Sequence, residues 1–236
     1  MMRRLAKWHI WLGWLVGVPL VMWTLTGLVM VSRPIETVRG DHLRADMSAV
    51  DESLPAGLAL PAALDLSGGD IERIEIASPD GVPLVWATRE DGSVQRYDAR
   101  TGRALPRLTM REAQGIAVAG TAIDGQASAP PPPAQFFEAD AVPFDFRRPM
   151  PVWQVAMADG THVYVGADTA RIEAVRTRWW RLFDVMWGLH IMDLEAREDT
   201  SHPILIAFAA LSLIGSLVGC VLLFRRRKAR IKVPRG

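Results

Sequence analysis

The chain has 236 residues, half of them hydrophobic, and a formal net charge of +1 that gives no sign of a nucleic-acid partner. Cys220 is its only cysteine, which excludes disulfide bonds, iron–sulfur clusters and cysteine-based zinc sites from the rest of the chain. The sequence also lacks HExxH, phosphate-loop and dinucleotide-binding motifs, so hydrolytic and nucleotide chemistry have no support.

Two stretches of the chain, residues 8–32 and 200–224, contain no Asp, Glu, Lys or Arg. At about 1.5 Å per helical residue, each is long enough to cross a hydrocarbon core of roughly 30 Å. We therefore expect two transmembrane helices. The first is expected to be an uncleaved anchor, because a signal peptide has an apolar region of only about 7–15 residues and a small-residue cleavage site.

The charges predict the orientation of these helices. All 26 acidic residues and 17 of the 27 basic residues lie between the two stretches, a net charge of −9, while residues 1–7 and 225–236 carry the other ten basic residues. Cations next to a membrane segment stay in the cytoplasm. Both termini are thus expected to be cytoplasmic, with residues of about 33–200 on the outer side.

The region between the spans alternates helix and strand signals. Residues 71–76, 83–88 and 93–97 read as three strands, the last two joined by an Asp-Gly turn. Six residues return 68 positions later, which indicates an internal repeat: Pro83, Asp91, Gly92, Ala99, Thr101 and Arg103 are matched by Pro151, Asp159, Gly160, Ala167, Thr169 and Arg171.

Each repeat is expected to place a helix before its antiparallel sheet, giving units at 33–108 and 109–175. The first helix is expected at 54–66, and the second follows a capping box that begins at Thr109. Four prolines at 130–133 predict an extended spacer inside the second unit.

The segment 176–199 is predicted to be an interfacial amphipathic helix leading into the second span. At helical spacing, its apolar residues share one face with a histidine. This face comprises Trp179, Leu182, Phe183, Met186, Trp187, His190 and Leu194.

Short motifs in this order resemble the PepSY-associated transmembrane family. Tyr97-Asp-Ala-Arg-Thr-Gly-Arg-Ala-Leu105 resembles the closing signature of a PepSY unit, and His9-Ile-Trp-Leu-Gly13, with Leu-Thr-Gly at 25–27, resembles the first helix of the family. In the second unit Thr169-Ala170 replaces Thr-Gly, so we expect a distorted turn there. The expected fold is a bacterial inner-membrane protein in which two transmembrane α-helices flank an exported α+β region of two PepSY-like helix-plus-antiparallel-sheet units.

Larger members of this family, with four or more spans, resemble ferric-siderophore reductases that hold b-type haem between membrane histidines. The resemblance therefore implies haem b and makes histidines its candidate ligands. His190, with Met186 and Trp187 beside it, is the preferred outer ligand, and His42 is its expected outer partner. The alternative for His190 is a hydrogen bond to a backbone carbonyl at the bilayer surface.

His9 is the candidate inner ligand. It shares a helix face with Gly13 and Gly17, although helix packing explains such glycines without a cofactor. The cytoplasmic half of the second span offers neither His nor Met, so a haem at His9 would need a second copy of the chain or a reductase partner subunit. His202 is a further cofactor-binding candidate that alternatively caps the second span, and His162 reads as a surface residue.

The sequence thus predicts transmembrane electron transfer to iron or an iron–siderophore, as a component of a ferric reductase in the lipid bilayer. Two readings compete with it. One is a cofactor-free membrane-tethered module that binds or inhibits a periplasmic protein or peptide by strand addition. The other is a non-redox assembly subunit of a reductase complex.

Overall fold

The structure, a computed structural model, describes residues 2–44, 69–123 and 130–230. It divides into two compact units, one formed by Met1–Pro34 with Leu182–Gly236 and the other by Ile35–Arg181. The helix expected at 54–66 lies outside the described residues.

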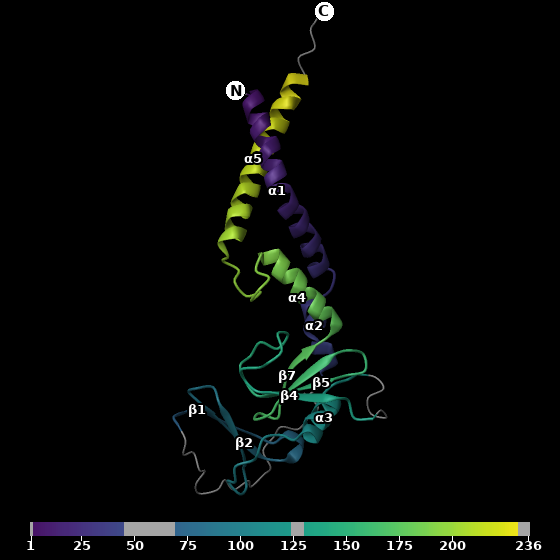
Figure 1. The fold of residues 1–236 in the computed structure, drawn as a ribbon, viewed down its shortest axis with the longest axis vertical. Helices are drawn as coiled ribbons and strands as arrows, with labels where there is room; N and C mark the ends of the chain where they lie inside the picture. Colours follow the sequence, from purple (N-terminus) through teal and green to yellow (C-terminus); the bar gives the residue numbers. More distant parts are fainter. Residues whose placement is uncertain (1, 45–68, 124–129, 231–236) are drawn as a thin grey trace, which may run out of the picture. The chain divides into compact units, whose positions relative to one another are not determined.

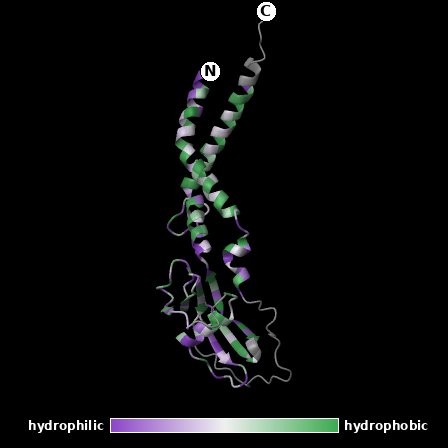
Figure 2. Cartoon of the chain, turned by 90° about the vertical axis from the view of Figure 1, so that its right-hand side faces the viewer, coloured by the Kyte–Doolittle hydropathy of each residue, from purple (hydrophilic) through white to green (hydrophobic). Residues whose placement is uncertain are grey.

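The first unit contains the two longest helices, α1 (Met2–Val31) and α5 (Pro203–Arg230) (Figure 1). Within them, Arg3–Val31 and Pro203–Arg225 are long and apolar enough to cross a membrane. Apolar residues cover both helices along most of their length (Figure 2). The helices contact each other where α5 has glycines, because a Cβ atom at Gly215 would lie 3.3 Å from Leu12 Cδ2.

Helix α4 (Arg178–Ile191) precedes α5 and is shorter than the helix expected over 176–199. It stops at Ile191 because Met192 has a φ of 58°, in the left-handed region, and the residues after it form turns. Leu194, expected on the apolar face of this helix, instead lies in the following loop and is 58% exposed. At the other end, residues up to Arg176 belong to a strand.

The second unit holds two antiparallel sheets. The first has the order β1-β2-β3, with β1 Ile71–Ala77, β2 Leu84–Arg89 and β3 Val94–Asp98, as the sequence predicts. The second has the order β4-β5-β6-β7, with β4 Ala134–Phe137, β5 Val152–Ala156, β6 His162–Gly166 and β7 Ile172–Arg176. Strand β4, which directly follows the proline run, was not expected.

Short helices precede and connect the strands. They are α2 (Ile35–Arg39), the 3-10 turns η1 (Asp41–Leu43) and η3 (Pro79–Gly81), and α3 (Met110–Ala119). The predicted capping box of α3 is present, since the Thr109 side chain accepts from the Glu112 N–H and the Glu112 carboxylate accepts from the Thr109 N–H.

Helix α3 packs against β4, β5 and β6, and this contact forms the largest core of the second unit. Fully burying a valine side chain contributes about 1.5–3 kcal/mol, so the buried valines of β5 and β6 carry much of its stability. The buried residues of this core are Leu108, Ala113, Ala117, Val155, Met157, Val163 and Val165.

The hydrogen bonds of the two predicted repeats match at the 68-residue offset. Three backbone bonds of the first hairpin recur in the second, each between an N–H and a carbonyl at corresponding positions. In the first hairpin the N–H groups of Gly92, Ala99 and Asp98 donate to the carbonyls of Arg89, Pro83 and Arg103, in that order. In the second hairpin the N–H groups of Gly160, Ala167 and Gly166 donate to the carbonyls of Met157, Pro151 and Arg171. The repeat seen in the sequence therefore extends to the backbone geometry of the hairpins.

The closing turn of the second repeat is not distorted, contrary to our expectation. Gly102 has a φ of 70°, and Ala170, at the corresponding position, has a φ of 56°. The bond from Gly102 to Asp98 and the bond from Ala170 to Gly166 are both 2.9 Å long. The turn keeps its shape, and the cost is backbone strain of about 1–2 kcal/mol at Ala170.

The two sheets differ in a fourth strand. Val165 pairs with Ile172 at the start of β7, and the corresponding residues Tyr97 and Ala104 form only an isolated bridge. Pro106 occupies the position that corresponds to a residue inside β7. Because proline has no N–H to donate, the isolated bridge is not extended into a fourth strand of the first sheet within the described residues.

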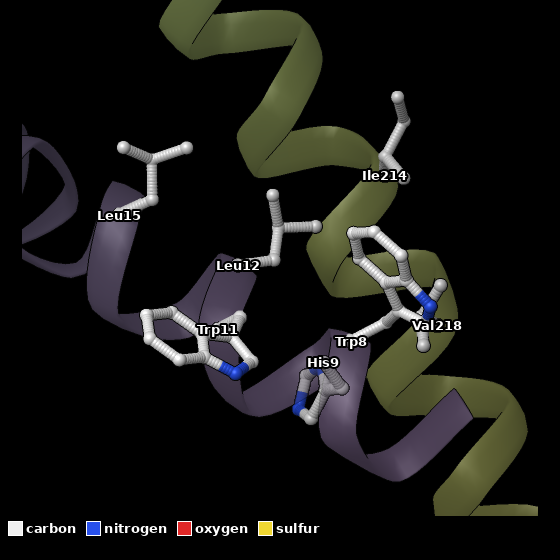
Figure 3. A pocket seen from close by; sticks show the side chains of 7 residues that line it. All are labelled: Trp8, His9, Trp11, Leu12, Leu15, Ile214 and Val218. Atoms are coloured by element: carbon white, nitrogen blue, oxygen red, sulfur yellow. The ribbon is translucent and has the colours of Figure 1, made fainter. Parts of the chain in front are cut away.

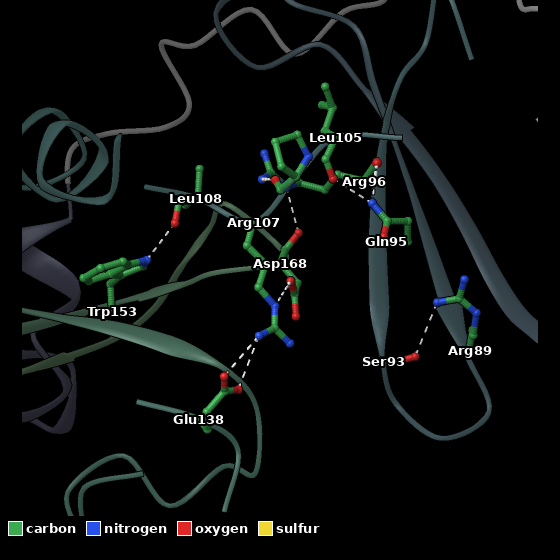
Figure 4. Close-up of polar contacts among 11 residues, drawn as sticks. Arg89, Ser93, Gln95, Arg96, Leu105, Arg107, Leu108, Glu138, Trp153 and Asp168 are labelled. Carbon is green, nitrogen blue, oxygen red and sulfur yellow. Dashed lines mark hydrogen bonds and ion pairs between the residues drawn. The ribbon is translucent and has the colours of Figure 1, made fainter. Parts of the chain in front are cut away.

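The closing turn of the second repeat also binds the first sheet (Figure 4). The indole N–H of Trp86 donates to Thr169 O at 2.8 Å, and Arg96 Nε donates to Asp168 O at 2.7 Å. Arg107 pairs with the Asp168 carboxylate at 3.0 Å. These bonds join both sheets into one unit.

Candidate functional site

His190, near the end of α4, is held by α1 within the first unit. Its Nδ1 lies 2.9 Å from Thr26 Oγ1, and its backbone carbonyl accepts a hydrogen bond of 2.8 Å from the indole N–H of Trp23. A Cβ atom at Gly27 would lie 3.6 Å from His190 Cε1, an ordinary van der Waals distance, so the imidazole packs against this part of α1. Residues 23, 26 and 27 share one face of α1 because they lie three and four positions apart.

The surroundings of Thr26 assign the tautomer of His190. The Thr26 hydroxyl lies 2.8 Å from Met22 O and 3.2 Å from Trp23 O, and these carbonyls can only accept. Its single hydrogen is therefore donated to the backbone, and the hydroxyl oxygen accepts from Nδ1–H of His190. In the neutral imidazole this leaves a lone pair on Nε2, the arrangement in which histidines bind metals.

The two residues predicted to flank His190 lie on the same helix. Met186 lies one turn before His190 and is half-buried. Trp187 donates its indole N–H to Arg197 O at 3.1 Å, so this side chain faces the loop after α4.

That loop is organised by Asp193, a residue that our sequence reasoning missed. Its carboxylate accepts hydrogen bonds from four backbone N–H groups, those of Glu195, Ala196, Glu198 and Asp199, at 3.0–3.2 Å. The N–H groups of Asp199 and Glu198 contribute most to lowering the pKa of the Asp193 carboxyl. An Asp just after a helix is the signal that could have revealed it.

A buried ion pair fixes the same loop against α4. Arg197 pairs with Asp184, whose side chain is only 7% exposed. Arg197 has a φ of 58°, which a non-glycine residue rarely adopts. The loop that follows His190 is thus built from several mutually supporting contacts.

His9 lies at the contact between α1 and α5, where a Cβ atom at Gly219 would come within 2.9 Å of its Cε1. Among the described residues its Nδ1 is buried and has no hydrogen-bond partner. Gly13 and Gly17 take no part in this contact, because an added Cβ at either would meet nothing within 4 Å. The glycines of α5 therefore serve the intrachain helix contact, and those of α1 do not.

Beside His9 lies a groove with a volume of about 490 Å³ (Figure 3). The residues that line it come from α1 and α5 and are predominantly apolar: Trp8, His9, Trp11, Leu12, Leu15, Ile214 and Val218.

The other candidate histidines lie outside α4. His42 is exposed in η1 of the second unit, so its pairing with His190 stays a prediction. His202 directly precedes α5, and its carbonyl accepts a hydrogen bond from the Ile206 N–H. The backbone of His202 therefore stands at the start of the helix, where the capping alternative places it. Its Nδ1 is buried without a partner in the described part of the chain.

His162, expected at the surface, belongs to a half-buried polar cluster in the second unit. It lies 3.4 Å from the Asp145 carboxylate, which also accepts from Tyr164 OH at 2.5 Å. Burial by itself would raise the pKa of Asp145, but the hydrogen bonds from His162 and Tyr164 outweigh it and lower that pKa. The alternation of β6, which places His162 and Tyr164 on one face, was the available signal.

Within residues 2–44, 69–123 and 130–230, no group of three or more His, Cys, Asp or Glu residues is placed to hold a metal ion. A ligand set of isolated histidines, such as axial haem ligands, is a different arrangement from such a group.

Comparison with known proteins gives a family assignment. The family described as the PepSY-associated TM region matches residues 6–236, nearly the whole chain. Neither curated proteins nor solved structures gave a match. The two apolar helices and the antiparallel sheets between them agree with that description, and the chain belongs to the PepSY-associated transmembrane family.

Proposed function

We propose that this membrane protein transfers electrons across the bacterial inner membrane to ferric iron or an iron–siderophore, through b-type haem ligated by His190. The observation that carries the proposal is the 2.9 Å contact between His190 Nδ1 and Thr26 Oγ1. It orients the ring and, in the neutral imidazole, leaves Nε2 as a lone-pair donor on the amphipathic helix α4.

The residues around His190 fit such a ligand. Thr26 fixes the tautomer of the His190 ring, and the indole N–H of Trp23 holds the backbone carbonyl of His190. A hydrogen bond to the non-ligating nitrogen is the usual support of a metal-binding histidine and raises its basicity. Met186 supplies an apolar neighbour one helical turn away.

Haem iron, when bound, would carry single electrons by alternating between its ferric and ferrous states. In this proposal His42 is the second outer ligand and His9 the inner one, with both termini in the cytoplasm. His9 has an unpartnered ring nitrogen among the described residues, which supports a role beyond helix packing. A second copy or a reductase subunit would complete the inner ligand set.

The absorption spectrum of the protein, purified in detergent from haem-replete cells, tests the proposal. We expect a Soret band and, after reduction, an α band. His190→Ala should lose these bands and still insert into the membrane, because both spans remain intact. His162→Ala, which removes a histidine bonded to Asp145 in the second unit, is the matched control and should keep them. A colourless wild-type protein, or an unchanged spectrum of His190→Ala, would refute the assignment.

A cofactor-free binding module is the second candidate, and the edge of the first sheet favours it. Among the residues that the structure describes, strand β1 pairs with β2 alone in that sheet, and Ile74 on it is 46% exposed. An edge strand of this kind can add the strand of a peptide or periplasmic protein. A colourless protein whose β1 amides become protected from hydrogen exchange when periplasmic extract is added would support this function.

A further inference from the structure

The groove between α1 and α5 has the properties of a site for an amphiphile. Its volume of about 490 Å³ falls in the range of roughly 300–1,000 Å³ that is typical of small-ligand pockets. Trp8 and Trp11 come from α1 and are each 74% exposed, while Ile214 and Val218 come from α5, and the Trp8 ring lies beside Val218 (Figure 3). His9 gives the lining a polar edge. Such a lining suits a hydrocarbon chain whose polar head lies nearby.

Cations lie at one end of this groove on both helices. Arg4 precedes Trp8 by four residues and Trp11 by seven, so it shares their face of α1. Arg225 follows Val218 by seven residues on α5 and shares the face of that residue in the same way. Both arginines are exposed. The apolar groove thus ends beside two positive charges.

We propose that this groove binds an anionic phospholipid of the phosphatidylglycerol class. One acyl chain lies along the wall formed by Trp8 and Val218, and the phosphate lies between Arg4 and Arg225. A phospholipid matches both halves of the site, because basic pockets between membrane helices bind anionic headgroups. Each cation favours an anionic over a zwitterionic headgroup by about fivefold.

The charge of the site is tested by lipid titration of the full-length protein in detergent. Native mass spectrometry should show a one-to-one complex with phosphatidylglycerol and much less with phosphatidylcholine. Arg4→Gln and Arg225→Gln should each weaken phosphatidylglycerol binding by about fivefold. The matched control is Arg3→Gln, which removes the same charge about 140° around α1 from Trp8. An equal loss in Arg3→Gln would overturn the proposal, since it would show only a general effect of positive charge.

The apolar half is tested by filling the groove. Val218→Trp should abolish the complex, while Leu217→Trp, at the same depth on a side chain that does not line the groove, should keep it. If inorganic phosphate displaced the lipid at a concentration equal to the lipid concentration that saturates the protein, the phosphate group alone would be recognised. Extraction of a stoichiometric membrane quinone, with no phospholipid, would assign the groove to a quinone. Either result would overturn the proposal, and neither depends on haem at His190.

Discussion

Replacement of Thr26 by valine tests the contact on which the proposed site depends. Valine has the shape of threonine, so Thr26→Val removes the hydroxyl and little else from a residue that is 2% exposed. Nδ1–H of His190 then loses its acceptor, while the bond from Trp23 to the His190 carbonyl remains. Hydrogen bonds between membrane helices contribute about 0.6 kcal/mol on average and at most about 1.7 kcal/mol, so the protein should remain folded.

The effect on ligand binding should be larger than the effect on stability. Loss of a hydrogen bond that supports a metal-bound histidine typically weakens metal binding by about 10–100-fold. We therefore expect Thr26→Val to weaken haem binding at least about tenfold in a Soret titration. Thr24→Val is the matched control, because the Thr24 hydroxyl donates only to Leu20 O on its own helix and is exposed.

A second measurement of this variant does not require haem. The ¹⁵N NMR shifts of the His190 ring should report protonation at Nδ1 in the wild-type protein and a mixture of tautomers in Thr26→Val. Wild-type haem affinity in Thr26→Val, or an equal loss in Thr24→Val, would refute the reasoning. A ring protonated at Nε2 in the wild-type protein would refute the assigned tautomer.

Four further predictions concern stability, packing and orientation. The pKa of Asp145 in the folded protein is lowered below its unfolded value of 3.8, so its contribution to stability is present above that pH and is lost as the pH falls through the folded pKa. The urea unfolding midpoint should therefore decline below about pH 4, and it should decline less in Asp145→Asn. Ala170→Gly should change the unfolding free energy by less than about 1 kcal/mol. The variant relieves backbone strain of about 1–2 kcal/mol, but it loses about 0.4–1 kcal/mol to the entropy of the unfolded chain and about 0.8 kcal/mol with the methyl group. Stabilisation above about 2 kcal/mol would contradict this balance. Gly219→Leu should separate α1 from α5 and lower the thermal unfolding midpoint. Gly13 has open space around it, so Gly13→Leu should leave that midpoint unchanged and should reduce self-association in detergent, measured by sedimentation. A cytoplasm-specific reporter should be active when fused to the C-terminus and inactive when inserted at 130–133, and the reverse pattern would contradict the orientation.

The features that the sequence predicted depend on neighbours in the chain. The absence of charge over 8–32 and 200–224 marks the apolar parts of the two long helices, which continue into the flanking basic residues, and the capping box at Thr109 needs only the residue three positions later. The Asp-Gly turns fix two hairpins whose hydrogen bonds repeat at a constant offset. Such features are determined by local sterics, short hydrogen bonds and the transfer of side chains from water.

Tertiary structure decided which distant residues meet. Thr26 and His190 are 164 residues apart, and the apolar face of α4 gave no indication that a hydroxyl on α1 would select its tautomer. Ala170 adopts a positive φ because the hairpin around it imposes that geometry against the residue's own preference. Long-range partners of this kind depend on the packing of whole elements, which brings together groups whose separation along the chain carries no signal.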